Sequence, residues 1–181
     1  MTSVKVAIRV RPFNEREITN GSGCCIKIEG DTTIITDPQT GTKKKFTFDH
    51  SYWSHDGYEV DESTGMFEKN SPSSIYASQT MVFNDLGLEV LDNAFNGYHT
   101  CLFAYGQTGS GKSYSIFGYG ANIGIIPMAC SEIFRRITEA KEKAENDNKS
   151  KNENVKEDDN TFVAGNIKYE VTVSMLEIYN E

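Results

Sequence analysis

The sequence lacks any long apolar run, and this absence limits what the chain can be. No stretch of its 181 residues approaches the ~20 consecutive apolar residues of a membrane-spanning helix, so we expect no transmembrane segment. The first residues, MTSVKVAIRVRPF, alternate in polarity and carry arginines inside their apolar run. This pattern argues against a secretory signal peptide.

Cysteine is scarce, and basic residues are outnumbered by acidic ones. The four cysteines, Cys24, Cys25, Cys101 and Cys130, form no C-x-x-C pair, and two adjacent cysteines do not resemble a secreted disulfide framework. We therefore expect reduced thiols in a cytoplasmic protein. The net charge of −8 argues against nucleic acid as a partner and against strong attraction to any acidic polymer.

Short β segments dominate the first third of the chain. Residues 4–11, VKVAIRVR, alternate with period two and predict a strand. Three further β segments, separated by turn-rich pieces, predict a small β lobe at about 24–48. Residues 54–76 show no period and are predicted to be a surface loop that contains an insert near 56–74. The β segments of the lobe are 25–29, 33–36 and 44–48.

Helical spacing begins near residue 79. Apolar residues recur on one face over 79–96, and Gly97 is a plausible stop. Residues 100–105, TCLFAY, are nearly all apolar and predict a strand buried on both faces of a sheet. A loop at 118–124 follows, and Pro127 suits the first turn of another helix.

A charged, low-complexity insert occupies residues 139–160. It offers almost nothing to bury, so we expect disorder there, with a charged helical extension at its start as the alternative. Alternation over 167–175 then predicts a final strand.

A phosphate-binding loop is predicted at residues 106–113, directly behind the apolar segment. GQTGSGKS fits G-x-x-x-x-G-K-[ST] without a mismatch. Glycines let backbone N–H groups turn toward an anion, and the loop opens a helix whose first amides favour phosphate. Lysine supplies a positive charge for the β- and γ-phosphates, and the final hydroxyl supplies an oxygen for Mg²⁺. The predicted phosphate contacts are Gly106, Gln107, Thr108, Gly109, Ser110, Gly111, Lys112 and Ser113, with Ser113 also on the metal.

Several longer stretches together resemble the first half of a kinesin motor domain. They include VKVAIRVRPFNERE, FTFDHSYWSHD, FAYGQTGSGKSYS, GIIPMACSEIFRRI and VTVSMLEIYNE, in this order. FAYGQTGSGK is far more specific than a bare phosphate-binding loop, and R-x-R-P on the first strand adds independent support. SYWSHD and the tyrosine after Ser113 resemble the kinesin-3 subfamily.

The resemblance implies an α/β fold of the P-loop NTPase class, with a central mixed sheet flanked by helices and incomplete in this chain. It implies that the complete head hydrolyses Mg-ATP and moves along microtubules, which places it in the cytoplasm on the cytoskeleton. Carried over by position, Arg9, Arg11 and Pro12 would border the adenine and Tyr114 would stack on it. Without the resemblance, Arg9 and Arg11 read as a solvated strand face.

The kinesin motifs that position water and sense the γ-phosphate are missing from the sequence. Neither N-x-x-S-S-R-S-H nor D-L-A-G-S-E occurs, so we assign no catalytic residue. We expect a partial motor domain whose switch motifs and most microtubule contacts follow residue 181. The alternative is a non-motor nucleotide-binding or regulatory fragment. A GTPase is disfavoured, because no N-K-x-D motif occurs.

Overall fold

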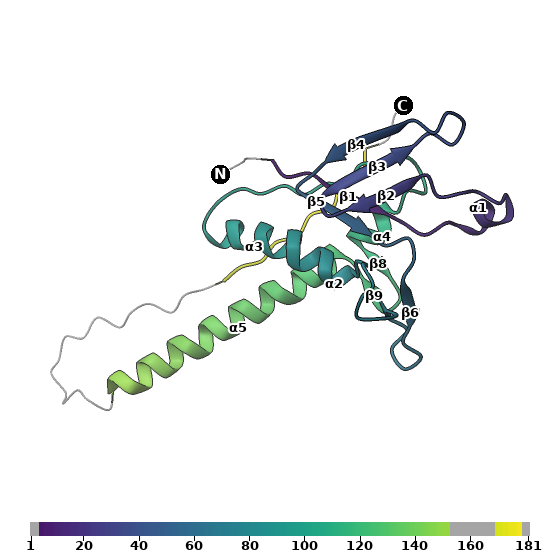
Figure 1. Ribbon diagram of the computed structural model, residues 1–181. Helices are drawn as coiled ribbons and strands as arrows, with labels where there is room; N and C mark the ends of the chain where they lie inside the picture. The colour runs from purple at the N-terminus through teal and green to yellow at the C-terminus, as the bar shows by residue number, and fades with distance from the viewer. Residues whose placement is uncertain (1–3, 153–168, 179–181) are drawn as a thin grey trace. The chain divides into compact units, whose positions relative to one another are not determined.

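The computed structural model describes residues 4–152 and 169–178 (Figure 1). The chain divides into two compact units, with the boundary between Ala129 and Cys130. All strands found among the described residues belong to the first unit. The buried apolar side chains of that unit are Val10, Ile34, Tyr52, Tyr76, Ala77, Val82, Phe83, Leu91 and Ile125.

The predicted N-terminal strand is present in a shorter form. β1 (Ala7–Val10) pairs in parallel with β5 (His50–Trp53), in a register that runs from Ala7 opposite His50 to Val10 opposite Trp53. The Val6 N–H donates to the Asp49 carboxylate at 2.8 Å, before the ladder begins. α1 (Glu15–Thr19) follows β1 directly.

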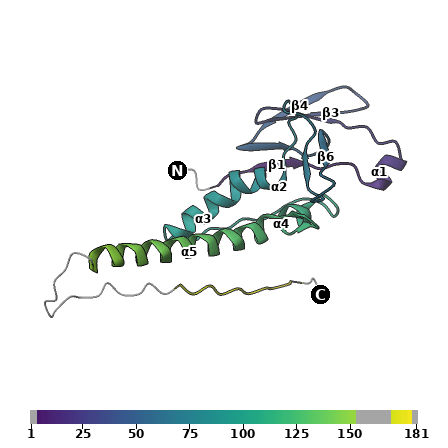
Figure 2. The same ribbon diagram turned by 90° about the horizontal axis from the view of Figure 1, so that it is seen from below.

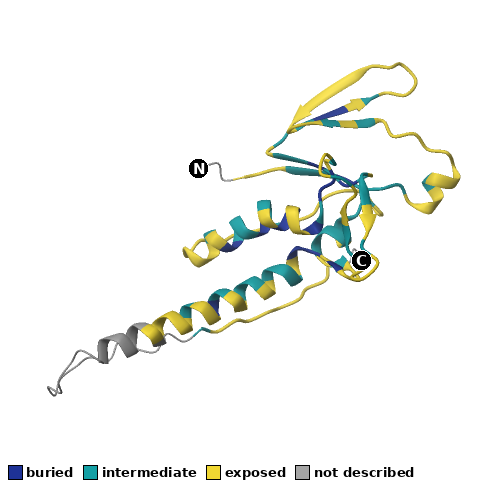
Figure 3. Ribbon diagram, turned by 60° about the horizontal axis from the view of Figure 1, so that its bottom comes forward, coloured by how far each residue is buried: buried dark blue, intermediate teal, exposed yellow. Residues whose placement is uncertain are grey.

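The three β segments predicted between β1 and β5 form one antiparallel sheet. Its strands are β2 (Ile26–Glu29), β3 (Thr32–Thr36) and β4 (Lys43–Thr47), with β3 in the middle. Thr33 and Ile34 of β3 are buried, whereas β4 is exposed throughout (Figure 3). The short β segments read between turn-rich pieces therefore identified all three strands.

The loop predicted at 54–76 contains a hairpin, so that prediction was wrong for these residues. β6 (Tyr58–Val60) pairs antiparallel with β7 (Phe67–Lys69). The rings of Tyr58 and Phe67 lie 5.1 Å apart edge to face, which stabilises the pairing. At the tip, the Asp61 carboxylate accepts the N–H groups of Ser63 and Thr64 at 2.8 and 2.9 Å.

The predicted helix over 79–96 is confirmed, with an irregular centre. α2 (Gln79–Val82) continues through the π-helical turn η1 (Phe83–Gly87) into α3 (Leu88–Phe95), as one rod in Figure 2. A Cβ on Gly87 would lie 2.3 Å from the Phe83 ring, so this position accommodates the ring. Gly97, at φ +86°, ends the rod in a Schellman motif closed by Tyr98 N–H on the Asn93 carbonyl at 3.0 Å.

Two predicted strands are not formed among the described residues. Residues 100–105 lie in no strand, and Phe103 and Tyr105 are 82% and 95% exposed. Residues 169–175 of the predicted final strand are likewise unpaired, while 167 and 168 lie outside the described residues. A strand needs a neighbour to receive its backbone hydrogen bonds, and the described strands pair among themselves.

The segment after the predicted phosphate-binding loop is more regular than expected from the sequence. α4 (Lys112–Ile116) is followed, within the predicted loop 118–124, by the small hairpin of β8 (Gly118–Tyr119) and β9 (Asn122–Ile123). α5 (Ile125–Asn152) then begins with Pro127 in its first turn, as predicted.

The charged insert is helical where the structure describes it. α5 includes residues 139–152, so the prediction of disorder was wrong there and the alternative of a charged helical extension is confirmed. Residues 153–160 lie outside the described residues. Alanine, glutamate and lysine are strong helix formers, and Arg135 with Glu139 and Arg136 with Glu132 make pairs one turn apart.

Candidate functional site

The loop Gly106–Gly111 turns at three glycines whose φ angles are positive. Gly106, Gly109 and Gly111 take φ values of +150°, +78° and +95°. A Cβ on Gly106 would lie 2.5 Å from the Ser110 hydroxyl oxygen, so only glycine fits this position without a shift. Gly111 serves as the N-cap of α4 without a side chain. The glycines in the motif are therefore needed by the geometry of the loop.

The Lys112 side chain folds back and binds the start of the loop. Its ammonium group donates to the carbonyl oxygens of Gly106 and Gln107, both at 2.8 Å. Ser113, the next residue of α4, is exposed. The structure thus places a positive charge at the centre of the loop and a hydroxyl beside it.

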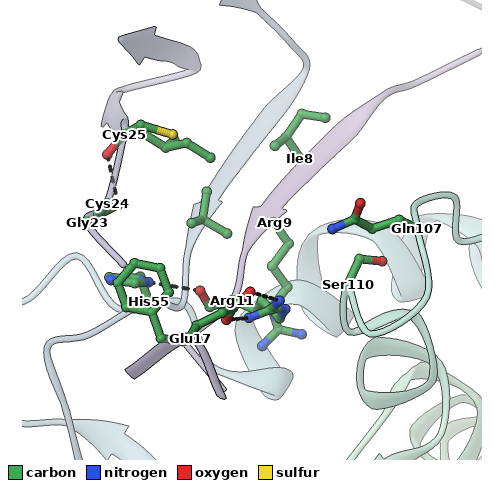
Figure 4. Close-up of a pocket in the computed structure, with 13 residues that line it drawn as sticks. Ile8, Arg9, Arg11, Glu17, Gly23, Cys24, Cys25, His55, Gln107 and Ser110 are labelled. Carbon is green, nitrogen blue, oxygen red and sulfur yellow. Dashed lines mark hydrogen bonds and ion pairs between the residues drawn. The ribbon is translucent and has the colours of Figure 1, made fainter. Parts of the chain in front are cut away.

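A cavity of about 280 Å³ lies between β1, the segment before β2 and the loop (Figure 4). Gln107 and Ser110 line it from the loop, and Arg9 and Arg11 line it from β1. Of the residues predicted to bind nucleotide, these four are the ones that share the cavity. The remaining lining residues are Ile8, Val10, Phe13, Glu17, Gly23, Cys24, Cys25, Ile26 and His55.

Arg11 is held by α1 at the edge of this cavity. Its guanidinium donates to both carboxylate oxygens of Glu17 at 2.7 Å and to the Pro12 carbonyl at 2.7 Å. The bidentate pair lowers the pKa of Glu17 to about 2. Asn14 and Glu17 also form a capping box on α1, a signal readable from N-x-x-E that the sequence prediction did not use. Arg11 is therefore a fixed cation rather than a freely solvated one.

Arg9 lies in a polar network instead of on a solvated strand face. Its guanidinium donates to the Ser54 hydroxyl at 2.9 Å, to the Gln79 side-chain oxygen at 2.6 Å and to the Ser115 hydroxyl at 3.1 Å. Its central carbon lies 5.3 Å from the ring centroid of Tyr114. The pKa of Arg9 is lowered, mainly because its guanidinium is buried. The structure thus joins the predicted residues Arg9 and Tyr114 to each other.

Tyr114 lies among other aromatic residues. Burial raises its pKa and raises that of Tyr76 to about 12, and the hydrogen bond between the two side chains lowers the pKa of Tyr114 while it raises that of Tyr76. Tyr114 and Pro12 are not among the residues that line the cavity. Their contact with adenine stays a prediction, as do the nucleotide contacts of the loop.

Gln79 and Asn122 are two of the four buried polar residues that the structure describes, and the sequence prediction gave neither a role. Gln79 is 6% exposed and connects α2 to α4 and β9. Asn122 is 7% exposed, accepts the Phe67 N–H at 2.8 Å and donates to the Gly65 carbonyl at 3.0 Å. No local pattern marks either residue, because their partners lie 35 to 70 residues away in the sequence.

The part of the chain that the structure describes offers neither a metal-binding cluster nor a membrane-spanning helix. Among residues 4–152 and 169–178, no cluster of three or more His, Cys, Asp or Glu side chains is arranged to hold a metal ion. Within the same ranges, no helix combines the length and apolar character needed to cross a bilayer.

Comparison with known proteins identifies the family. Residues 9–181 match the family model of the kinesin motor domain. The chain is 46% identical to rat kinesin-like protein KIF28 over 180 residues, which is 99% of this chain and 15% of that protein. It is 44% identical to rat KIF1A, covering 9% of that protein, and 40% identical to unc-104 of Caenorhabditis elegans. The chain thus spans a small part of the curated relatives that it matches.

Solved structures of kinesin motor domains also resemble this chain. A KIF14 fragment with ADP in complex with a microtubule superposes with a TM-score of 0.63 at 42% identity, over 76% of this chain and 34% of that chain. A KIF14 dimer with AMP-PNP in complex with a microtubule gives a TM-score of 0.65 at 40% identity. These likenesses confirm the P-loop NTPase fold and the resemblance drawn from the sequence. With the family match covering nearly the whole chain, the chain belongs to the kinesin motor domain family.

Proposed function

We propose that this chain is the ATP-binding part of a kinesin microtubule motor. The observation that carries the proposal is the loop Gly106–Gly111, whose glycine backbone leads directly into Lys112 and Ser113 at the start of α4. This arrangement, within a kinesin motor domain, supports binding of Mg-ATP.

The residues present fit a nucleoside triphosphate and its magnesium ion. Positive φ at three loop glycines is compatible with backbone N–H groups that turn toward an anion. The Lys112 ammonium lies against the same loop, and Ser113 offers an exposed hydroxyl oxygen, a donor type that Mg²⁺ accepts. The ammonium group of Lys112 therefore matches the negative charge of the phosphates, and the hydroxyl oxygen of Ser113 matches the preference of Mg²⁺ for oxygen ligands.

Each residue would have one role. Lys112 would exchange its two carbonyl partners for phosphate oxygens, and Ser113 would hold the metal. The loop amides would bind the phosphates, while Arg11, Pro12 and Tyr114 keep their predicted place near the adenine. Bound Mg-ATP supplies the phosphoryl group that hydrolysis transfers to water.

A complete motor needs parts that these 181 residues do not contain. The motifs expected to position water and sense the γ-phosphate do not occur in the 181 residues. KIF14, which superposes on this chain, was solved with microtubules, and this supports microtubules as the partner and the cytoplasmic cytoskeleton as the location. The absence of those motifs also means that this chain alone should not hydrolyse ATP.

A titration with a fluorescent ATP analogue tests the proposal in a complete motor domain that contains this sequence. Lys112→Ala should weaken binding by at least ~10- to 100-fold, because hydrogen bonds to a charged group are worth ~1.5–3 kcal/mol. Lys69→Ala is the matched control, since Lys69 is an exposed lysine on β7. Equal affinity of the Lys112 variant and the wild type would contradict the proposed site.

Hydrolysis separates the motor from the alternative of a non-motor nucleotide-binding fragment. The motor reading predicts that the complete domain releases phosphate faster when microtubules are added. Tight nucleotide binding without any hydrolysis in the complete domain would favour the alternative instead.

A further inference from the structure

Gln79 makes three hydrogen bonds, although it is far from the phosphate-binding motif in sequence. Its side-chain nitrogen donates to the Tyr114 carbonyl at 2.6 Å and to the Asn122 carbonyl at 3.2 Å. Its side-chain oxygen accepts from Arg9 at 2.6 Å. Two carbonyls need donors and one guanidinium needs an acceptor, so only one orientation of the amide satisfies all three partners.

The two carbonyls that Gln79 binds lie on either side of the turn after the phosphate-binding loop. Tyr114 belongs to α4, which has only five residues, and Asn122 begins β9. The last carbonyls of a helix have no partner within it, and a helix this short is not stable alone. Gln79 therefore supplies a donor that α4 itself lacks and ties this helix to the following hairpin.

Arg9 completes the connection from the opposite side. It donates to the Ser115 hydroxyl of α4 at 3.1 Å, to Ser54 at 2.9 Å and to the Ala77 carbonyl at 3.3 Å. Its guanidinium also lies over the Tyr114 ring. The side chains of Arg9 and Gln79 together contact α4 through the Tyr114 ring, the Tyr114 carbonyl and the Ser115 hydroxyl.

We propose that Gln79 and Arg9 are positioning residues for the phosphate site: they fix α4, and with it Lys112 and Ser113, on β1 and β9. This inference rests on the proposed function, because it concerns how the site for Mg-ATP is held. It assigns Arg9 a role in phosphate binding through Gln79 and α4. Direct contact of Arg9 with the adenine predicts a different result in the experiment below.

Two substitutions of Gln79 separate its bonds. Gln79→Glu keeps an acceptor for Arg9 and loses both donations to the carbonyls, whereas Gln79→Met removes all three bonds at similar length. Each leaves buried carbonyls without a partner, a cost that corresponds to roughly 5- to 100-fold in affinity when it falls on the bound conformation. Both variants should therefore weaken Mg-ATP binding to the complete motor domain by about 10-fold.

Inorganic tripolyphosphate with Mg²⁺ is the probe that distinguishes positioning from base contact. It is measured by competition with the fluorescent nucleotide, in wild type, the Gln79 variants and Arg9→Met. Positioning predicts that each variant loses affinity for tripolyphosphate and for ATP by the same factor. It also predicts that Arg9→Met combined with Gln79→Met costs less than the product of the two single losses, because the residues act as a unit.

A matched control removes the effect of lower stability. Leu91→Ala deletes a buried side chain of α3 that is outside the phosphate site, and it should lower Tm while changing both affinities less than twofold. The inference is overturned if the Gln79 variants bind both ligands like Leu91→Ala at similar Tm, or if Arg9→Met weakens ATP alone. Failure of the wild-type domain to bind either ligand would instead refute the proposed function.

Discussion

In the 181-residue chain, the segment TCLFAY (100–105) should behave as an unpaired strand. Phe103 and Tyr105 are 82% and 95% exposed, and the segment belongs to none of the described sheets. Burying a large apolar side chain is worth ~1.5–3 kcal/mol, so these two residues leave roughly 3–6 kcal/mol of stabilisation unused. A whole domain is stable by only ~5–15 kcal/mol. We therefore expect the isolated chain to be poorly folded or prone to aggregation.

Hydrogen exchange and light scattering test this expectation together. Amide protons of residues 100–105 should exchange at nearly unstructured rates, and replacing both Phe103 and Tyr105 by serine should reduce aggregation without lowering Tm. Tyr98→Ser is the control, because Tyr98 is also exposed, at 62%, but lies outside the segment. If amides 100–105 are as protected as those of the central strand β3, the segment is paired and the reasoning is refuted.

Three further predictions concern the metal, the insert and α1. In the complete domain, Ser113→Ala should raise the Mg²⁺ concentration needed for nucleotide binding while leaving metal-free binding unchanged, and an identical midpoint in a Mg²⁺ titration would exclude the assigned metal contact. Replacing residues 141–160 with a short Gly/Ser linker should shift Tm by only a few degrees, since closure entropy changes slowly with length, and a large drop would show that the insert packs. Arg11 lowers the pKa of Glu17 to about 2, so the contribution of this pair to stability is present at neutral pH and is lost as pH falls from the usual glutamate range of about 4.3 toward 2. Glu17→Gln should therefore flatten the decline of Tm over that acidic window, and an unchanged slope there would argue against the ion pair.

Patterns in the sequence predicted those helices, strands and loops whose conformation depends on residues close together in the chain. The helix over 79–95 was predictable because its apolar residues recur with helical spacing, and the strands of the lobe because short β segments stand between turn-rich pieces. The loop at 106–111 was predictable from its motif, whose three glycines take positive φ values that other residues rarely adopt. In each case the information lies within a few residues of the element it determines.

Other features depend on partners far away in the sequence. The alternating pattern of the first strand placed Arg9 on a solvated face. In the structure its guanidinium instead binds partners that lie 45 to 106 residues away in the sequence. The hairpin in 54–76 depends on the contact between Tyr58 and Phe67 and on the turn at Asp61, which no regular period reveals. The apolar run 100–105 has the composition of a buried strand, but composition alone does not supply the neighbouring strand that it needs.

Phosphate release from Mg-ATP by the complete motor domain, with and without microtubules, tests the central claim most directly. Wild type should turn over ATP, microtubules should accelerate it, and Lys112→Ala should abolish the acceleration at nucleotide concentrations that saturate wild type. A Lys112→Ala domain whose microtubule-stimulated rate equals that of wild type would contradict the assignment of residues 106–113 as the ATP site of a kinesin motor.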